Sequence, residues 1–345
     1  MKKKGSVLKI ILIVAGCIVL LFLLGVGGLL IWGNSYINQR IDREEITGNI
    51  NLAEDEIFEG PTVDVTENQE EIDAVKKEFE DAQNIELAQM EGVENILLIG
   101  ADRHGQGENG RSDSMILVSL NHKTGNIHLT SFMRAMYVCI PRSDGNVWSM
   151  LNAAYSWGGP NLLIDTIELN FRVKIDKYVV VDFAAFEKAV DLLGGVELTL
   201  TEDEANHVRY NCGVPTEPGT QVLNGKQTRG YCQIRMIDND FMRTARQRKV
   251  IEVLLQKAKK MDLSTMLAIS DAVLPMVNTN LSNSEILVYL TRCIPMLKNP
   301  VTQRMLPVEN ESGKSYYGII YVGGREMYRV DFAHNIKALH EFINS

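Results

Sequence analysis

The sequence predicts an α/β domain, with a sheet covered by helices on both faces, carried by one N-terminal transmembrane helix. From residue 93 onward, short apolar runs of strand length alternate with longer segments of helical periodicity, the pattern of a sheet flanked by helices. Before it, an uncharged run from Ile10 to Trp32 is long enough, at about 1.5 Å per residue, to cross a hydrocarbon core of roughly 30 Å.

The charges around the apolar run predict its orientation. Lysines are concentrated in residues 1–9, before the run, whereas acidic and basic residues are mixed after it. The positive-inside rule places residues 1–9 in the cytoplasm and the rest outside the cell. The run continues well past the small residues at 15–17, which favours an uncleaved anchor over a signal peptide. We therefore expect a single-pass protein of the cell membrane, with a cytoplasmic N-terminus and an extracellular main domain.

Charge and composition divide the extracellular part and restrict its partners. The 345-residue chain has a net charge of −9, so it lacks the positive footprint that nucleic acid requires. Residues 33–92 are acidic, with little apolar periodicity before Ile72, and predict a stalk containing one helix, from Asp73 to Met90. Residues 93–345 are sufficient for one large domain.

Hydrophobic periodicity gives the elements of the main domain. Strands are predicted at 95–100, 115–120, 126–131, 178–182, 196–200, 304–308 and 318–321. Helices are predicted at 151–170, 183–193, 241–261, 263–274, 284–297 and 332–343, the first interrupted at Gly158-Gly159-Pro160. The letters of Gly105-x-Gly107-x-x-Gly110 match a dinucleotide-binding motif, but no strand-to-helix setting accompanies them, so we exclude that function.

The first cluster of polar residues brackets one glycine-rich loop. Asp102 and Arg103 precede this loop, and Arg111 and Asp113 follow it. Carboxylates with phosphate oxygens suit Mg²⁺, and arginine forks bind phosphate, so the four residues are typical of a metal and an anion bound together. The alternative is structural: the carboxylates cap a turn and a helix, and the arginines are solvated.

The second cluster is a single arginine at the end of a strand. Arg134 follows the apolar run that ends in Ser131-Phe132-Met133. Packing explains an arginine poorly at this place, whereas a salt bridge at the rim of the domain is the plain alternative.

The third cluster runs from Tyr231 to Lys249. If its first residues form a strand, Ile234 faces the core while Gln233 and Arg235 face a cleft. Arg243, Arg246 and Gln247 then share one helical face near a helix N-terminus, where an anion is favoured. A basic solvated face is the alternative for residues 243–249.

Two extracellular cysteines leave a question about covalent structure. Cys212 and Cys232 flank a turn rich in proline and glycine. A loop-closing disulfide and two separate thiols, buried as small apolar side chains, are both consistent with this spacing.

Taken in order, these clusters resemble the LytR-CpsA-Psr family, the cell-wall ligases of Gram-positive bacteria. The similarity covers about residues 95–260 and includes the segments between the clusters. The matching segments are Asn95–Arg103, Arg111–Met115, Ser131–Arg134, Asn152–Tyr155 with Gly158-Gly159, Leu192–Glu197, Leu223–Gln227, Tyr231–Arg235 and Asp240–Val250.

This resemblance implies an α/β/α sandwich with a central mixed sheet and a hydrophobic tunnel for a polyprenyl chain. It implies transfer of a glycan phosphate, as in teichoic acid or capsule attachment, from an undecaprenyl-pyrophosphate carrier to a peptidoglycan sugar hydroxyl. Asp102 and Asp113 would hold Mg²⁺ and, with Arg134, form the catalytic group. The pyrophosphate-binding side chains would be Arg103, Arg111, Arg134, Arg235, Arg243 and Gln247.

The chain departs from the family pattern around two of these positions. Met133 and Ala135 flank Arg134 where Pro and Asp are usual, and Gln233 replaces the first arginine of an Arg-x-Arg pair. These departures leave two other functions open beside the transferase. One is hydrolysis of the same polyprenyl pyrophosphate, with water in place of the sugar. The other is non-enzymatic binding of a lipid or glycan by an envelope regulator.

Overall fold

A computed structural model gives the fold of most of the predicted main domain. It describes residues 46, 48–49, 51, 67–101, 110, 112–234, 240–258, 269, 272–282, 285, 292, 296, 298–308 and 317–345. Within these ranges, the side chains of residues 113, 240–241, 243–245, 248, 255, 258 and 274 are not described. The predicted transmembrane helix lies outside the described residues, as do most of the helices predicted at 263–274 and 284–297.

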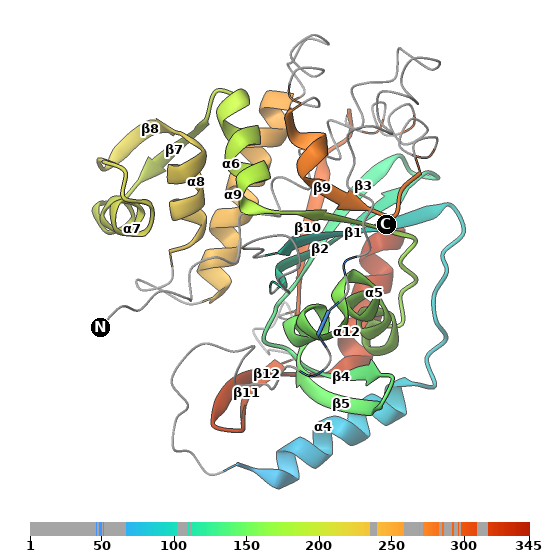
Figure 1. Cartoon of the computed structure of the whole chain (residues 1–345). Coiled ribbons are helices and arrows are strands. Elements are labelled where there is room, and N and C mark those ends of the chain that lie inside the picture. Colours follow the sequence, from blue (N-terminus) through green and yellow to red (C-terminus); the bar gives the residue numbers. More distant parts are fainter. Residues whose placement is uncertain are drawn as a thin grey trace. The chain divides into compact units, whose positions relative to one another are not determined.

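The order of elements confirms the predicted α/β class, with helices and strands interspersed along the chain (Figure 1). The helices are α4 (Gln69–Ala82), α5 (Leu151–Phe171), α6 (Phe183–Leu192), α7 (Glu202–Cys212), α8 (Gly225–Cys232), α9 (Asp240–Ala258), α12 (Phe332–Asn344) and the 3₁₀ turn η1 (Leu274–Met276). The strands are β1 (Val93–Ala101), β2 (Ser112–Asn121), β3 (Asn126–Phe132), β4 (Tyr137–Arg142), β5 (Gly145–Met150), β6 (Lys177–Val181), β7 (Val196–Leu200), β8 (Gly219–Leu223), β9 (Val277–Thr279), β10 (Val301–Leu306), β11 (Tyr317–Val322) and β12 (Arg325–Val330).

A six-stranded mixed sheet is central to the fold. Its order is β10-β3-β2-β1-β6-β9, with β10 parallel to β3 and with the pairs β2–β3 and β6–β9 antiparallel. Strand β1 is buried from Asn95 to Ala101, as expected of a strand covered on both faces. Within the described part of the chain, no helix is both long and apolar enough to cross a membrane.

The chain divides into two compact units, which we describe separately. Unit 1 contains Lys177–Lys298 and the end of β1 from Leu98. Unit 2 contains Glu45–Leu97, His104–Asp176 and Asn299–Ser345.

Helix α4 packs on unit 2, although it lies in the segment predicted as a stalk. Ile72, Val75 and Phe79 are buried at helical spacing. The Phe79 ring contacts the rings of Trp148 on β5 and Phe332 on α12, with centroids 5.2 and 5.5 Å away. The helix ends at Ala82, earlier than predicted. Its apolar face therefore contributes to the core of unit 2.

Helix α5 is broken where the sequence predicts an interruption. Gly158 and Gly159 have non-helical backbone angles, and Gly159 has a φ of +63°. The backbone of residue 46 runs so close that a Cβ on Gly159 would lie 2.1 Å from the Ile46 carbonyl oxygen. Asn49 N–H also donates to the Ser156 carbonyl at 3.0 Å. The glycines therefore allow an upstream segment to lie directly against α5.

Unit 1 contains a group of short elements that the sequence analysis missed. Helices α7 and α8 lie with the antiparallel pair of strands β7 and β8 (Figure 1). Of these four elements, only β7 was predicted. Helix α9 was predicted and matches closely. Its Lys257 ammonium donates to the carbonyls of Leu193, Gly194 and Gly195, at 3.3, 3.1 and 2.7 Å, and so satisfies the C-terminus of α6.

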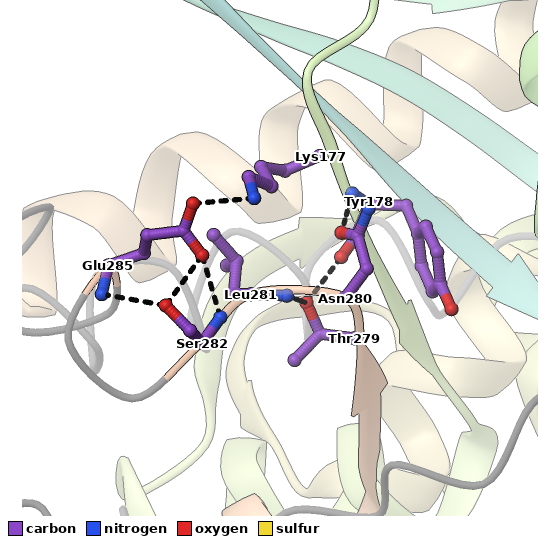
Figure 2. Close-up of polar contacts among 7 residues, drawn as sticks. All are labelled: Lys177, Tyr178, Thr279, Asn280, Leu281, Ser282 and Glu285. Carbon is purple, nitrogen blue, oxygen red and sulfur yellow. Dashed lines mark hydrogen bonds and ion pairs between the residues drawn. The ribbon is translucent and has the colours of Figure 1, made fainter.

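Polar contacts attach β9 to β6 at the edge of the sheet (Figure 2). The Asn280 Oδ1 accepts from Tyr178 N–H at 2.9 Å. Glu285 forms an ion pair with Lys177 and accepts from Ser282 N–H and Oγ, at 2.8 and 2.7 Å. The hydrogen bond from Lys177, followed by that from Ser282, lowers the pKa of Glu285 to about 2. The short outer strand is therefore held by side chains as well as by its ladder.

The disulfide considered for Cys212 and Cys232 is not formed, because both residues are free thiols. Cys212 Sγ donates to the Val208 carbonyl within α7. Cys232 is fully buried, and burial raises the pKa of its thiol far above the usual range. Of the two interpretations, separate thiols are confirmed for this structure, with Cys232 buried and Cys212 partly exposed.

Candidate functional site

The turn that carries Arg134 in unit 2 is held by backbone hydrogen bonds on several sides. Met133 N–H donates to Leu306 O on β10 at 3.0 Å. Ala135 O accepts from Tyr328 N–H on β12 at 2.8 Å. The Arg134 carbonyl itself accepts from Asn152 N–H at 3.2 Å. The half-buried Arg134 is thus presented on a turn fixed to two strands and a helix.

Arg134 lies next to the N-terminus of α5. Besides Asn152 N–H, Leu151 N–H donates back to this turn, reaching Met136 O at 3.0 Å. The N-cap residue, Met150, makes no side-chain hydrogen bond to the helix. These hydrogen bonds fix the Arg134 turn to the start of α5, so Arg134 is held beside the first helical turn.

Gly110, which follows the loop of the first cluster in sequence, contacts the same helix. Ser156, one turn after Asn152, directs its Oγ to the carbonyl of Gly110 at 3.4 Å. Gly110 is buried and precedes Arg111 and Asp113 in sequence. The end of the glycine-rich loop and the Arg134 turn thus both contact the first turns of α5.

The predicted metal ligands lie outside the described side chains. Asp102, Arg103 and Arg111 lie outside the described residues, and Asp113 is placed in β2 by its backbone alone. Strands β1 and β2, which flank the loop, are neighbours in the sheet. Among the side chains that are described, no group of three or more His, Cys, Asp or Glu residues is arranged to hold a metal ion.

The strand considered for the start of the third cluster is not formed in the described residues of unit 1. Tyr231 and Cys232 end helix α8, and Gln233 is its C-cap. Gln233 and Ile234 are both buried, 2% and 0% exposed, so the two do not alternate between core and cleft. The Nε2 atom of Gln233 is buried without a hydrogen-bond partner in the described part of the chain. Arg235 lies outside that part.

Helix α9 buries two of the three residues that were predicted to share one anion-binding face. Arg246 is 5% exposed, and it binds Glu204 Oε1 on α7 at 3.0 Å and the Ile234 carbonyl at 3.1 Å. Arg246 therefore links α9 to α7 and to Ile234 within unit 1. Gln247 is 4% exposed, and its Nε2 has no partner among the described residues. Arg243 belongs to α9, but its side chain is outside the description.

Asn152 was quoted in a sequence motif but given no role. A polar residue near the start of a predicted helix was the only signal, and it is equally typical of a cap. In the structure, Asn152 is 0% exposed and lies between the Arg134 turn and the helical turn that contacts Gly110.

Comparisons with known proteins point to one family. The model of the LytR_cpsA_psr family matches residues 61–327. The "Regulatory protein MsrR" of Staphylococcus aureus is 34% identical over 202 residues, covering 57% of this chain and 59% of MsrR. The "Polyisoprenyl-teichoic acid--peptidoglycan teichoic acid transferase TagV" of Bacillus subtilis is 31% identical over 168 residues, covering 47% of this chain and 43% of TagV. The chain thus spans about half the length of these curated relatives.

A solved structure supports the fold. TagT, a B. subtilis protein, has been solved in a complex described as "TagT bound to LIIa-WTA". It aligns with a TM-score of 0.59 and 23% identity, over 76% of this chain and 96% of TagT.

Proposed function

Because the chain belongs to the LytR_cpsA_psr family, we propose that it is a membrane-anchored phosphotransferase outside the cell. It moves a glycopolymer with its phosphate from an undecaprenyl-pyrophosphate carrier to a sugar hydroxyl of peptidoglycan. The name of the TagV relative describes a transfer of this kind. The observation that carries the proposal is Arg134, fixed by its turn beside the N-terminus of α5.

Arginines suit this reaction because negative charge develops on the leaving oxygen. The acceptor oxygen forms a bond to the phosphorus that bears the glycan, and the bond from that phosphorus to the bridging oxygen breaks. Undecaprenyl phosphate leaves with the electron pair, while the acceptor hydroxyl loses its proton. Donors aimed at the leaving oxygen stabilise the charge that develops there. Arg134 has this role, and the other pyrophosphate-binding side chains are Arg103, Arg111, Arg235, Arg243 and Gln247.

Mg²⁺ is the proposed cofactor, and its ligands are Asp102 and Asp113. Two carboxylates with substrate phosphate oxygens are a donor set that fits Mg²⁺, and the strands before and after their loop are adjacent in the sheet. When bound, the ion would neutralise charge on the phosphates. One of the two carboxylates would also take the proton of the acceptor hydroxyl.

The proposed location follows from the carrier. A polyprenyl pyrophosphate stays in the membrane, so its enzyme gains from an anchor in the same bilayer. Residues 10–32 would be this anchor, with residues 1–9 in the cytoplasm and the main domain outside.

Transfer of label tests the proposal directly. The full chain, in detergent with Mg²⁺, is given a polyprenyl-pyrophosphate-linked glycan whose glycan-proximal phosphate carries ³²P, together with peptidoglycan. We expect the label on peptidoglycan. Label released only as a soluble glycan phosphate would instead identify a hydrolase. Carrier that is bound tightly and recovered unchanged would identify a non-enzymatic binder, and both results would overturn the transferase.

A further inference from the structure

We propose that the side-chain amide of Asn152 binds the phosphate group of the substrate, through a hydrogen bond from Nδ2 to an anionic phosphate oxygen. The proposal rests on the proposed function and adds to it a substrate-binding residue on α5. It concerns unit 2 alone.

The first argument is the state of the Asn152 amide. The residue is 0% exposed, and neither Oδ1 nor Nδ2 has a hydrogen-bond partner within the described part of the chain. Burying an amide without partners is unfavourable, and folds rarely keep such a group without a reason. A substrate oxygen that accepts from Nδ2 would supply a missing hydrogen-bond partner.

The second argument is the place of Asn152 between two predicted clusters. Its backbone N–H donates to the Arg134 carbonyl at 3.2 Å. Asn152 and Ser156 are four residues apart and so lie on one face of α5. Ser156 Oγ reaches Gly110 O at 3.4 Å, at the end of the glycine-rich loop. The Asn152 side chain therefore leaves the helix on the face that contacts Gly110.

The charges around Asn152 decide which ligand it takes. The cationic Arg134 lies on the adjoining turn, whose carbonyl accepts from Asn152 N–H. A metal ion on Oδ1 would be repelled by this charge. An anionic oxygen on Nδ2 would be attracted by it, and a primary amide offers two N–H donors. Phosphate is the anion that the proposed reaction supplies.

The test measures affinity and folding together. Farnesyl pyrophosphate is titrated calorimetrically into the full chain in detergent, and each variant is also checked by thermal melting. Asn152→Leu removes the donor at similar size, and we expect at least about tenfold weaker binding, with a melting temperature at or above that of the wild type. Asn152→Asp places a carboxylate there, and we expect a still larger loss of affinity.

Matched variants make the result specific. Thr166→Val alters another buried polar residue of α5, whose hydroxyl donates to Leu162 O, and it should leave the affinity unchanged. Arg134→Ala should weaken binding on its own account. If Arg134→Ala weakens binding while the folded Asn152→Leu binds like the wild type, the role of Asn152 is overturned and the proposed function stands.

Two other outcomes also count against the proposal. Tighter binding by Asn152→Asp, dependent on added Mg²⁺, would show that Oδ1 faces a cation. No binding of the probe by the wild type would overturn the proposed function and this inference with it.

Discussion

Two asparagines of α5 are equally buried, but they differ in whether their side chains have hydrogen-bond partners among the described residues. Asn170, near the C-terminal end, donates to the carbonyls of Cys139 and Thr166 at 2.6 and 2.8 Å, and its Oδ1 accepts from Cys139 N–H at 3.0 Å. Asn152, near the N-terminal end, is just as buried but has no side-chain partner in the described part of the chain. Burial alone therefore does not separate a structural amide from a binding one, whereas the origin of its partners does.

Two arginines also differ in where the fold places them. Arg246 in unit 1 has its counter-charge within the fold, in Glu204, and a second acceptor in the Ile234 carbonyl. Arg134 in unit 2 is half-buried and lies on a turn that is bonded to the start of α5. Both belong to clusters predicted to bind an anion, and the described contacts assign Arg246 to an internal ion pair.

Removing Arg246 gives the largest stability effect that we expect. Arg246→Ala leaves the largely buried Glu204 without its partner, which costs about 3–5 kcal/mol for a buried pair. Urea unfolding of the full chain measures it. Arg134→Ala is the comparison and should cost less, because Arg134 is only half-buried whereas Arg246 is 5% exposed. Equal losses in the two variants would remove the distinction between these arginines.

Asn170→Ala should have the next largest effect. It leaves the buried N–H and carbonyl of Cys139 without their side-chain partner, and we expect a loss on the order of 2–4 kcal/mol. Asn152→Ala, measured beside it, should cost much less because no hydrogen bond to described residues is broken. A larger loss at Asn152 than at Asn170 would reverse the comparison.

Acid should lower the stability of the fold through His340 on α12. His340 Nε2 lies 2.9 Å from the carbonyl of Arg172, the C-cap of α5, and burial lowers the pKa of this histidine. Below about pH 6.5 the unfolded chain binds a proton that the folded chain resists, so stability is full above that pH and falls as the pH decreases. Melting temperatures at pH 7.5 and 5.5 should show this fall, and His340→Gln should reduce it. An unchanged slope in that variant would assign the effect to other groups.

A reducing agent should leave the thermal stability unchanged, which is the smallest effect that we predict. Cys212 and Cys232 are free in the structure, so no bond between them contributes to stability. The melting temperature should be the same with and without dithiothreitol, and intact-mass analysis after alkylation under denaturing conditions should show both thiols modified. A protected pair would mean that the disulfide considered from the sequence forms after all.

Strong periodicity made much of the fold predictable. The long apolar strands β1 to β3, the break in α5 and helices α9 and α12 follow patterns that extend over many residues. Helix α7 was missed because it is largely polar and buries only Ala205 and Val208. Helix α8 was missed because it is short and because the residues from Tyr231 onward were interpreted as a strand. Its capping box, Asn224 with Gln227, was the available signal.

The candidate site was predictable in residue type but not in role. A run of arginines and acids in sequence does not show which charges the fold pairs internally, and Arg246 is the example. Asn152 could not be assigned from the sequence because an unpartnered amide is a property of its surroundings.

A crystal structure of the full chain with farnesyl pyrophosphate and Mg²⁺ tests the central claim most directly. The account predicts a phosphate at the N-terminus of α5, with oxygens at about 2.7–3.2 Å from the Arg134 guanidinium and from Asn152 Nδ2. Pyrophosphate bound away from α5, with Asn152 as it is now, would contradict it.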